Sequence, residues 1–416
     1  MLLRSRAVVA PKPVSITRNT LFNTIGCLVY QGCMWLITVL VVYLSGYTDS
    51  GILAYAMAIG NVFLSIASFN IRVFQVSDIN NTYTPGNYVA FRILTVVLAY
   101  ALILPYIFFT TDNRVLIFPT ALFLLFKTDE AFVDVLYAID QKGERMDYIG
   151  LSQGLRGVAV TLAFTMALYF FDSIVTSFFA MFLTGLVFTV AYDLPRALRF
   201  GSLDITICFD SAKSLLSDGV PVVVSLTLYS AITTVARQVF GNIYGAEELG
   251  FYAAVATPAV LVQAAGRYLY APSLVPLTET VGKLDYQAAR SFFFKTIGII
   301  VLAALGSMVA LGVVGPKMLL MLYGPSIEPY AGLLVVVTLC TFMLALSNYM
   351  LDVLTILRDM RYGLFITVFS FLVCVAASGP LIRSFGMNGL NLVIMLSSLF
   401  ILMAAFIRIM FKLTRA

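Results

Sequence analysis

The sequence predicts an all-α polytopic membrane protein, and three observations support this fold class. Hydrophobic residues make up 61% of the 416-residue chain, and only 11% of its residues are charged. The mean hydropathy is +0.96, and a water-soluble domain does not bury so much apolar surface with so few charges. The apolar residues also form runs of roughly 20 to 28 residues, and about 20 residues cross a bilayer as a helix.

These runs predict twelve transmembrane helices. They lie near residues 19–45, 51–71, 88–109, 115–139, 147–171, 174–195, 215–244, 248–277, 292–315, 330–357, 362–382 and 387–411. With the amino terminus inside, eighteen basic residues fall in cytosolic loops and tails, and three face outward: Arg114, Lys317 and Arg383. Cytosolic loops of membrane proteins carry the excess of Lys and Arg, so both termini are predicted to be cytosolic.

The widest internal gap, from Arg196 to Ser214, divides the prediction into two six-helix halves, residues 1–200 and 201–416. A weak internal repeat supports this division. Gly46 to Gly51, followed by Tyr55, comes after the first helix, and Gly245 to Gly250, followed by Tyr252, comes after the seventh. Copies six helices apart have the same orientation in the membrane, which indicates parallel repeats of the kind found in alternating-access transporters.

Catalysis is improbable for this composition. The chain has no histidine, which removes imidazole acid–base chemistry and most metal sites, and its cysteines show no CxxC spacing. The external loops are too short to hold a catalytic domain. Basic residues are distributed among loops rather than gathered in one patch, which excludes a nucleic-acid interface. We therefore expect no enzymatic activity, no metal and no cofactor.

The fourth predicted helix carries four charges within the membrane. Lys127, Glu130 and Asp134 share one face of this helix, whereas Asp129 points nearly the opposite way. Each buried charge costs about 2.5 to 3.5 kcal/mol on an insertion scale, so the charged stripe should face a partner or a wet cavity. Arg156 in the next helix is the nearest candidate partner. These residues either pair with one another to hold helices together or take part in transport.

Other basic residues also lie within predicted helices. Arg92 is close enough to the cytosolic end to serve as a topology anchor, whereas Arg237 and Arg267 lie deeper, with no acidic residue nearby on the same helix. Two interpretations stay open for these two arginines. They pair with a carboxylate of another helix, for which the candidates are Asp134, Asp218 and Asp352, or they bind an anion such as phosphate.

Two stretches resemble a known family. The first is Lys127-x2-Glu130-x3-Asp134-x6-Gln141-x3-Arg145-Met146-Asp147-x4-Ser152-x3-Arg156-Gly157, and the second is Tyr244-Gly245-Ala246-Glu247-Glu248-Leu249-Gly250-Phe251-Tyr252. They are similar to the fourth and fifth helices and to the turn between segments seven and eight of bacterial polysaccharide-repeat-unit flippases. These O-antigen and capsule transporters for lipid-linked oligosaccharides belong to the multidrug/oligosaccharidyl-lipid/polysaccharide exporter superfamily. Segment count and loop lengths extend the resemblance over the whole chain.

The resemblance implies two six-helix bundles that form a V around a central cavity. It implies a monomer in the bacterial cytoplasmic membrane that moves an undecaprenyl-diphosphate-linked oligosaccharide to the outer leaflet, beside a polysaccharide polymerase and glycosyltransferases. We expect Arg156, Arg237 and Arg267, with Lys127, to contact the diphosphate or acidic sugars. Of the three arginines, only Arg156 matches a motif position.

Three carboxylates are expected to couple an ion or to pair helices: Glu130, Asp134 and Asp352. Asp352 also stands close enough to the inner interface to be only a helix cap. The alternative function is a cation-coupled multidrug exporter of the same superfamily, which would use these carboxylates but would bring a cationic drug against four buried positive side chains.

Overall fold

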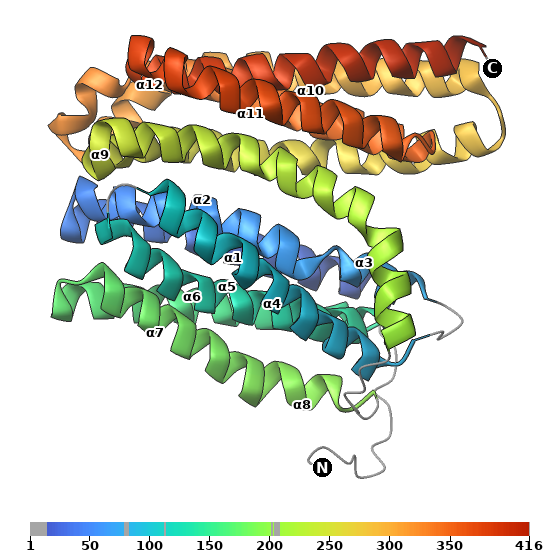
Figure 1. The fold of residues 1–416 in the computed structure, drawn as a ribbon, viewed down its shortest axis with the longest axis horizontal. Coiled ribbons are helices and arrows are strands. Elements are labelled where there is room, and N and C mark those ends of the chain that lie inside the picture. Colours follow the sequence, from blue (N-terminus) through green and yellow to red (C-terminus); the bar gives the residue numbers. More distant parts are fainter. Residues whose placement is uncertain (1–14, 79–82, 112–113, 201–202, 204–208, 416) are drawn as a thin grey trace. The chain divides into compact units, whose positions relative to one another are not determined.

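The computed structural model of the protein describes residues 15–78, 83–111, 114–200, 203 and 209–415 (Figure 1). Every regular element within these ranges is a helix. Contacts divide the chain into two compact units, Met1–Thr227 and Leu228–Ala416, called unit 1 and unit 2 below. The predicted boundary between residues 200 and 201 adjoins residues outside the described ranges and stays a prediction.

The helices follow one another in the order that the apolar runs predict. Their bounds are α1 Ile16–Ser45, α2 Tyr47–Ser68, α3 Ile71–Ser77, α4 Pro85–Thr110, α5 Ile117–Lys142, α6 Met146–Phe171, α7 Ile174–Phe188, α8 Leu194–Ala197, α9 Phe209–Gly282, α10 Tyr286–Tyr323, α11 Leu333–Ile356 and α12 Met360–Arg415. Short 3-10 turns precede α5 (Arg114–Leu116) and α11 (Pro325–Tyr330), and a π-helical turn, Thr189–Asp193, joins α7 to α8.

Two of these elements, α9 and α12, each consist of two consecutive helices separated by a kink. The backbone leaves the helical conformation at Gly245 in α9 and at Gly386 in α12. Counting each part separately, and α7 with α8 as one helix, the described chain contains the twelve long helices that the sequence predicts. Nine stretches of the described residues are long and apolar enough to cross a membrane. The helix α5 is not among them because of its charged middle.

The backbone supports the internal repeat. Gly46 has φ 87° and ψ −172°, and Gly245 has φ 90° and ψ 174°. Only glycine adopts this region readily, because a Cβ would clash with the backbone. The two glycines that the sequence comparison aligns therefore make the same turn between consecutive helices, once in each unit.

The helix α5 is the centre of unit 1. It packs against α2, α3, α4, α6, α7 and α8. A helix surrounded by other helices on all sides can carry charges on opposite faces without exposing them to lipid. This position explains why the most charged of the long helices is also among the most buried.

Helices α1 and α6 pack backbone against backbone. A Cβ added at Gly26 would overlap the Gly150 carbonyl group, and one added at Gly150 would overlap the carbonyl of Phe22. A Cβ at Gly154, one turn further along α6, would meet nothing closer than 3.8 Å, which is ordinary van der Waals contact. Small residues that allow such close approach are typical of helix pairs in membranes.

In unit 2, Asp359 fixes the connection between α11 and α12. Its carboxylate accepts hydrogen bonds from Arg408 Nε at 2.7 Å and from Lys412 Nζ at 3.1 Å. Lys412 also donates to the carbonyl oxygen of Leu357 at 3.1 Å, which caps the carboxyl end of α11. Burial favours the neutral carboxyl, but the bonds from Arg408 and Lys412 outweigh it and hold the pKa of Asp359 below its ordinary value.

We predict that Gly150→Ala lowers the stability of the protein by about 1 to 3 kcal/mol, because the added methyl group forces α1 and α6 apart. The measurement is the temperature at which half of the purified protein still elutes as a single species in size-exclusion chromatography. Gly154→Ala is the matched control and should leave that temperature unchanged. The same temperature for Gly150→Ala and Gly154→Ala would contradict the close packing of the α1 and α6 backbones.

We predict that Asp359→Asn destabilises the protein by up to about 1 kcal/mol at neutral pH, since the two basic partners are partly exposed. A carboxyl whose pKa is lowered by folding contributes its stability above the unfolded pKa, about 3.9, and loses it as the pH falls through the folded value. The difference in melting temperature between wild type and variant should therefore disappear in strongly acidic buffer. A difference in melting temperature that is the same at neutral and at strongly acidic pH would show that ionised Asp359 does not stabilise the fold.

Candidate functional site

The four charges in the middle of α5 are neutralised inside unit 1. Lys127 Nζ donates to Glu130 Oε2 at 2.6 Å, and the hydroxyl of Tyr30 on α1 donates to the other oxygen of the same carboxylate. Gly60 on α2 leaves room for this pair, since a Cβ there would lie 3.1 Å from Lys127 Cγ. Lys127 and Glu130 therefore form an ion pair within one helix, which holds α1 through Tyr30.

Arg156 on α6 pairs with Asp129, and the expectation that it pairs with the stripe of Lys127, Glu130 and Asp134 is wrong. Its Nη2 donates to Asp129 Oδ2, and its Nη1 donates to the hydroxyl of Thr189 at 3.2 Å. That hydroxyl donates to Asp129 Oδ1 at 2.6 Å. The reason is that α5 is surrounded on all sides, so the face opposite the stripe also meets protein.

Gly185 on α7 makes this close arrangement possible. A Cβ at this position would lie 2.6 Å from the Asp129 carboxylate and 3.0 Å from Arg156 Nη2. The next turn of the chain brings a second carboxylate, since Asp193 Oδ2 lies 4.0 Å from Arg156 Nη1. Arg156 therefore lies between a carboxylate that it binds and a second one just beyond hydrogen-bond distance.

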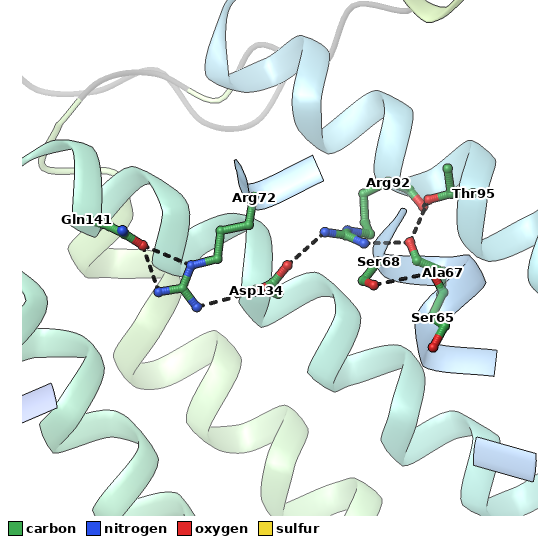
Figure 2. Close-up of polar contacts among 8 residues, drawn as sticks. All are labelled: Ser65, Ala67, Ser68, Arg72, Arg92, Thr95, Asp134 and Gln141. Carbon is green, nitrogen blue, oxygen red and sulfur yellow. Dashed lines mark hydrogen bonds and ion pairs between the residues drawn. The ribbon is translucent and has the colours of Figure 1, made fainter. Parts of the chain in front are cut away.

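Asp134 holds two arginines, as Figure 2 shows. Arg92 Nη2 donates to one oxygen at 3.0 Å, and Arg72 Nη1 lies 3.4 Å from the other. Arg72 also binds the side-chain oxygen of Gln141 through Nε at 3.0 Å and Nη2 at 2.9 Å. The ion pair joins α3 and α4 to α5.

Arg92 is fully buried, and the expectation that it extends to the cytosolic interface is wrong. The helix α2 ends at Ser68, and the next residue, Phe69, has a left-handed backbone with φ 47°. The last carbonyl groups of a helix lack partners within it. Arg92 Nη1 donates to the carbonyl oxygen of Ala67 at 2.5 Å, and Thr95 donates to it at 2.7 Å (Figure 2). Arg92 therefore caps α2.

Arg237 on α9 differs from these cations. It is half-buried, and no carboxylate of the described residues lies within 4 Å of its guanidinium group. Its buried Nε has no hydrogen-bond acceptor among the described residues. Within electrostatic range lies Tyr252, whose hydroxyl donates to Asn391 Oδ1 at 2.8 Å. The buried Nδ2 of Asn391 also lacks an acceptor in the described part of the chain.

The two remaining candidates of unit 2 are Asp352 and Arg267, and the structure describes the side chain of Asp352 only. Asp352 on α11 is half-buried and lies within electrostatic range of Tyr229, whose hydroxyl donates to the carbonyl oxygen of Leu344 at 2.5 Å. The side chain of Arg267, like that of Asp218, lies outside the part of the chain that the structure describes. Their roles stay predictions.

Sequence reasoning missed four residues that organise the site: Tyr30, Arg72, Thr189 and Asp193. The spacing of Thr189 and Asp193, four residues apart near the end of an apolar run, places both on one helix face and is a usable signal. Tyr30 stands in an apolar helix with no charged neighbour in sequence, so nothing near it indicates a partner on α5.

Solved structures of membrane transporters share this fold over nearly the whole chain. The lipid II flippase MurJ, in an inward closed conformation, aligns with a TM-score of 0.71 at 11% identity, covering 95% of this chain and 90% of its own. An inward-facing multidrug resistance MATE family transporter of the MOP superfamily aligns with a TM-score of 0.63 at 15% identity, covering 96% of both chains. A MOP superfamily transporter from Pyrococcus furiosus, described as having a binding pocket of reverse polarity, gives 0.58 at 16%, covering 96% of both chains.

No protein-family model matches the sequence, and no curated protein matches it. At 11 to 16% identity the structural matches establish the fold alone. The chain is an all-α integral membrane protein with the fold of these transporters. The function of the protein must be inferred from its own residues.

We predict that breaking the Asp129–Arg156 pair is more harmful than removing it. Asp129→Leu and Arg156→Met should each destabilise the protein by about 3 to 5 kcal/mol, because each leaves one buried charge without a partner. The double variant, which removes both charges, should be more stable than either single variant. Thermal unfolding of the four purified proteins measures this coupling. A double variant that is less stable than both single variants would show that the pair is not the source of the effect.

Proposed function

We propose that the protein is a flippase for an undecaprenyl-diphosphate-linked oligosaccharide. It moves this lipid by alternating access from the cytoplasmic to the outer leaflet of a bacterial inner membrane, for surface polysaccharide synthesis. Both termini are cytosolic in this proposal, and the protein works as a monomer beside a polymerase and glycosyltransferases. The shared fold with transporters, one of which is named a lipid II flippase, is consistent with this activity.

Arg237 carries the proposal. A guanidinium group inside an apolar helix is costly unless an anion neutralises it, and the described carboxylates of unit 2 do not reach it. Arginine presents its donors in a planar fork that fits phosphate oxygens, and it stays charged at every physiological pH. A diphosphate headgroup supplies the missing negative charge, whereas a cationic cargo would be repelled.

Two buried donor atoms linked by Tyr252 lack acceptors among the described residues. They are Arg237 Nε and Asn391 Nδ2, and both carry hydrogens to donate. A ligand with only acceptor oxygens, such as a phosphate group, complements this set. Tyr252 links the two side chains, since it lies within electrostatic range of one and donates to the other.

The other cations have a smaller part in this proposal. Lys127 and Arg156 are engaged by Glu130 and Asp129 in the observed conformation, so either would have to leave its carboxylate before it could contact the cargo. Arg267 would extend the cationic path on the helix that follows Gly245 in α9. These three contacts remain predictions.

The alternative is a cation-coupled multidrug exporter, which the fold also fits. Drug resistance of a sensitised bacterial host distinguishes the two functions. Resistance that the wild type confers, that is lost in Glu130→Gln or Asp352→Asn and that is kept in Arg237→Ala would favour the exporter. No resistance in any strain would favour the flippase.

We predict that Arg237→Ala weakens binding of undecaprenyl diphosphate to the full-length protein in lipid nanodiscs by roughly 10- to 100-fold. A hydrogen bond to a charged group contributes about 1.5 to 3 kcal/mol, which corresponds to that range. Arg237→Lys should retain part of the affinity because the charge stays but the planar fork is lost. Native mass spectrometry or a competition assay with a fluorescent analogue measures the change.

Arg290→Ala is the control for this experiment, because Arg290 is an exposed arginine on α10. It should bind undecaprenyl diphosphate as the wild type does. Undecaprenol, which lacks the diphosphate, should bind equally weakly to all variants. Unchanged diphosphate affinity in a well-folded Arg237→Ala protein would refute the anion site.

A further inference from the structure

Two carboxyl groups of unit 1 are buried without being neutralised by a direct bond. Asp140, near the end of α5, and Asp193, in the turn between α7 and α8, are each 1% exposed. Asp140 Oδ1 and Asp193 Oδ2 are buried atoms with no hydrogen-bond partner among the described residues. The two groups lie close enough to interact electrostatically. The basic side chains that surround them are engaged elsewhere.

The π-helical turn Thr189–Asp193 places Asp193 in this position. The turn widens the helix by one residue, and single π-turns occur frequently at functional sites. Both Thr189 and Asp193 are buried as a result, Thr189 against Asp129 and Asp193 beside Arg156.

The charged and titratable groups around the pair come from all the packed elements. Those within electrostatic range of Asp140 are Asp193, Arg196, Arg145, Asp147 and Tyr192. Those around Asp193 are Asp129, Tyr137, Asp140, Arg156, Tyr192 and Arg196, and the hydroxyl of Ser152 binds it.

Each arginine of this set is held by another group. Arg145 binds both oxygens of Asp147 at 2.8 and 2.9 Å. Arg156 binds Asp129, and its distance of 4.0 Å to Asp193 is too long for a hydrogen bond. Arg196 Nη1 donates to the carbonyl oxygen of Tyr192 at 3.2 Å, and its guanidinium lies 3.3 Å from the centre of the Tyr192 ring.

A buried carboxylate with an oxygen that accepts no hydrogen bond is costly, and a second negative charge near it raises that cost. Binding a proton lowers both penalties. We propose that Asp140 and Asp193 form a proton-binding site inside unit 1, and that its proton determines which carboxylate holds Arg156. With a proton on Asp193, Arg156 binds Asp129, as observed. When that proton leaves to solvent, the charged Asp193 competes for the same guanidinium and draws the π-helical turn toward α6.

This site differs from the carboxylates that the sequence suggests for ion coupling. Glu130 binds Lys127, and Asp134 binds Arg72 and Arg92, so each of these carboxylates already has a basic partner. The proton site needs no cargo and is independent of the proposed flippase activity. If it operates during transport, it would link movement within unit 1 to a proton gradient.

Infrared spectroscopy of the full-length protein in liposomes tests the proposal. The carbonyl stretch of a protonated carboxyl group should be visible at neutral pH, where exposed Asp and Glu are ionised. Asp140→Asn and Asp193→Asn should each remove this band, and Asp134→Asn, which changes a paired carboxylate, should leave it intact. The proposal is overturned if the wild type has no such band, or if the band survives in either folded Asn variant.

The fluorescence of Trp35, the single tryptophan of the sequence, is the probe for the proposed movement of Arg156. It lies on α1, which packs against α6. Its fluorescence in the wild type should change over the pH range in which the infrared band disappears. Asp193→Asn should abolish that change, while Asp359→Asn in unit 2 should retain it. A wild-type emission that is constant over this range, or a change that persists in Asp193→Asn, would contradict the exchange of Arg156 between carboxylates.

Discussion

The cost of placing charge among apolar helices governs unit 1 of this protein. Its central helix α5 carries more charge than a lipid-facing helix tolerates, and the four charges in its middle, Lys127, Asp129, Glu130 and Asp134, each have a partner on the same or an adjacent helix. Glu130 holds Lys127, Asp129 holds Arg156, and Asp134 holds Arg92. Pairs of this kind specify which helix faces meet, because any other register would leave an ion buried alone.

Unit 2 differs from unit 1 in where its ion pairs lie. Its described ion pairs lie at one end of α12, where Arg408 and Lys412 hold Asp359, and none reaches Arg237 within its apolar helix. The contrast gives the two units different chemical characters. Unit 1 holds its mid-helix charges in internal ion pairs, and unit 2 contains Arg237, a cation for which the described residues offer no carboxylate.

Much of the fold follows from the sequence, because helix length and bilayer thickness are fixed quantities. The apolar runs predict the order of the helices, and even the turns at Gly245 and Gly386 fall between predicted segments. The repeated glycines indicate the shared turn, since few residues other than glycine tolerate that backbone.

The partners of the buried charges are less predictable. A helical wheel places Asp129 nearly opposite the face that Lys127, Glu130 and Asp134 share. It does not tell which of these faces meets α6, since α5 has protein on all sides. Arg92 lies near a predicted helix end, so its depth depends on where α2 stops and leaves a carbonyl group to cap. The π-helical turn that buries Asp193 has no sequence signature at all.

The account rests on the proposal that Arg237, which has no carboxylate partner among the described residues, binds an anionic lipid headgroup. Transport in proteoliposomes tests this proposal most directly. A polyprenyl-diphosphate-linked oligosaccharide and a cationic dye would be offered to the same vesicles, with movement of each across the bilayer followed by enzymatic accessibility and by fluorescence. The account predicts that the diphosphate lipid crosses and the dye does not. Movement of the dye without movement of the diphosphate lipid would contradict it.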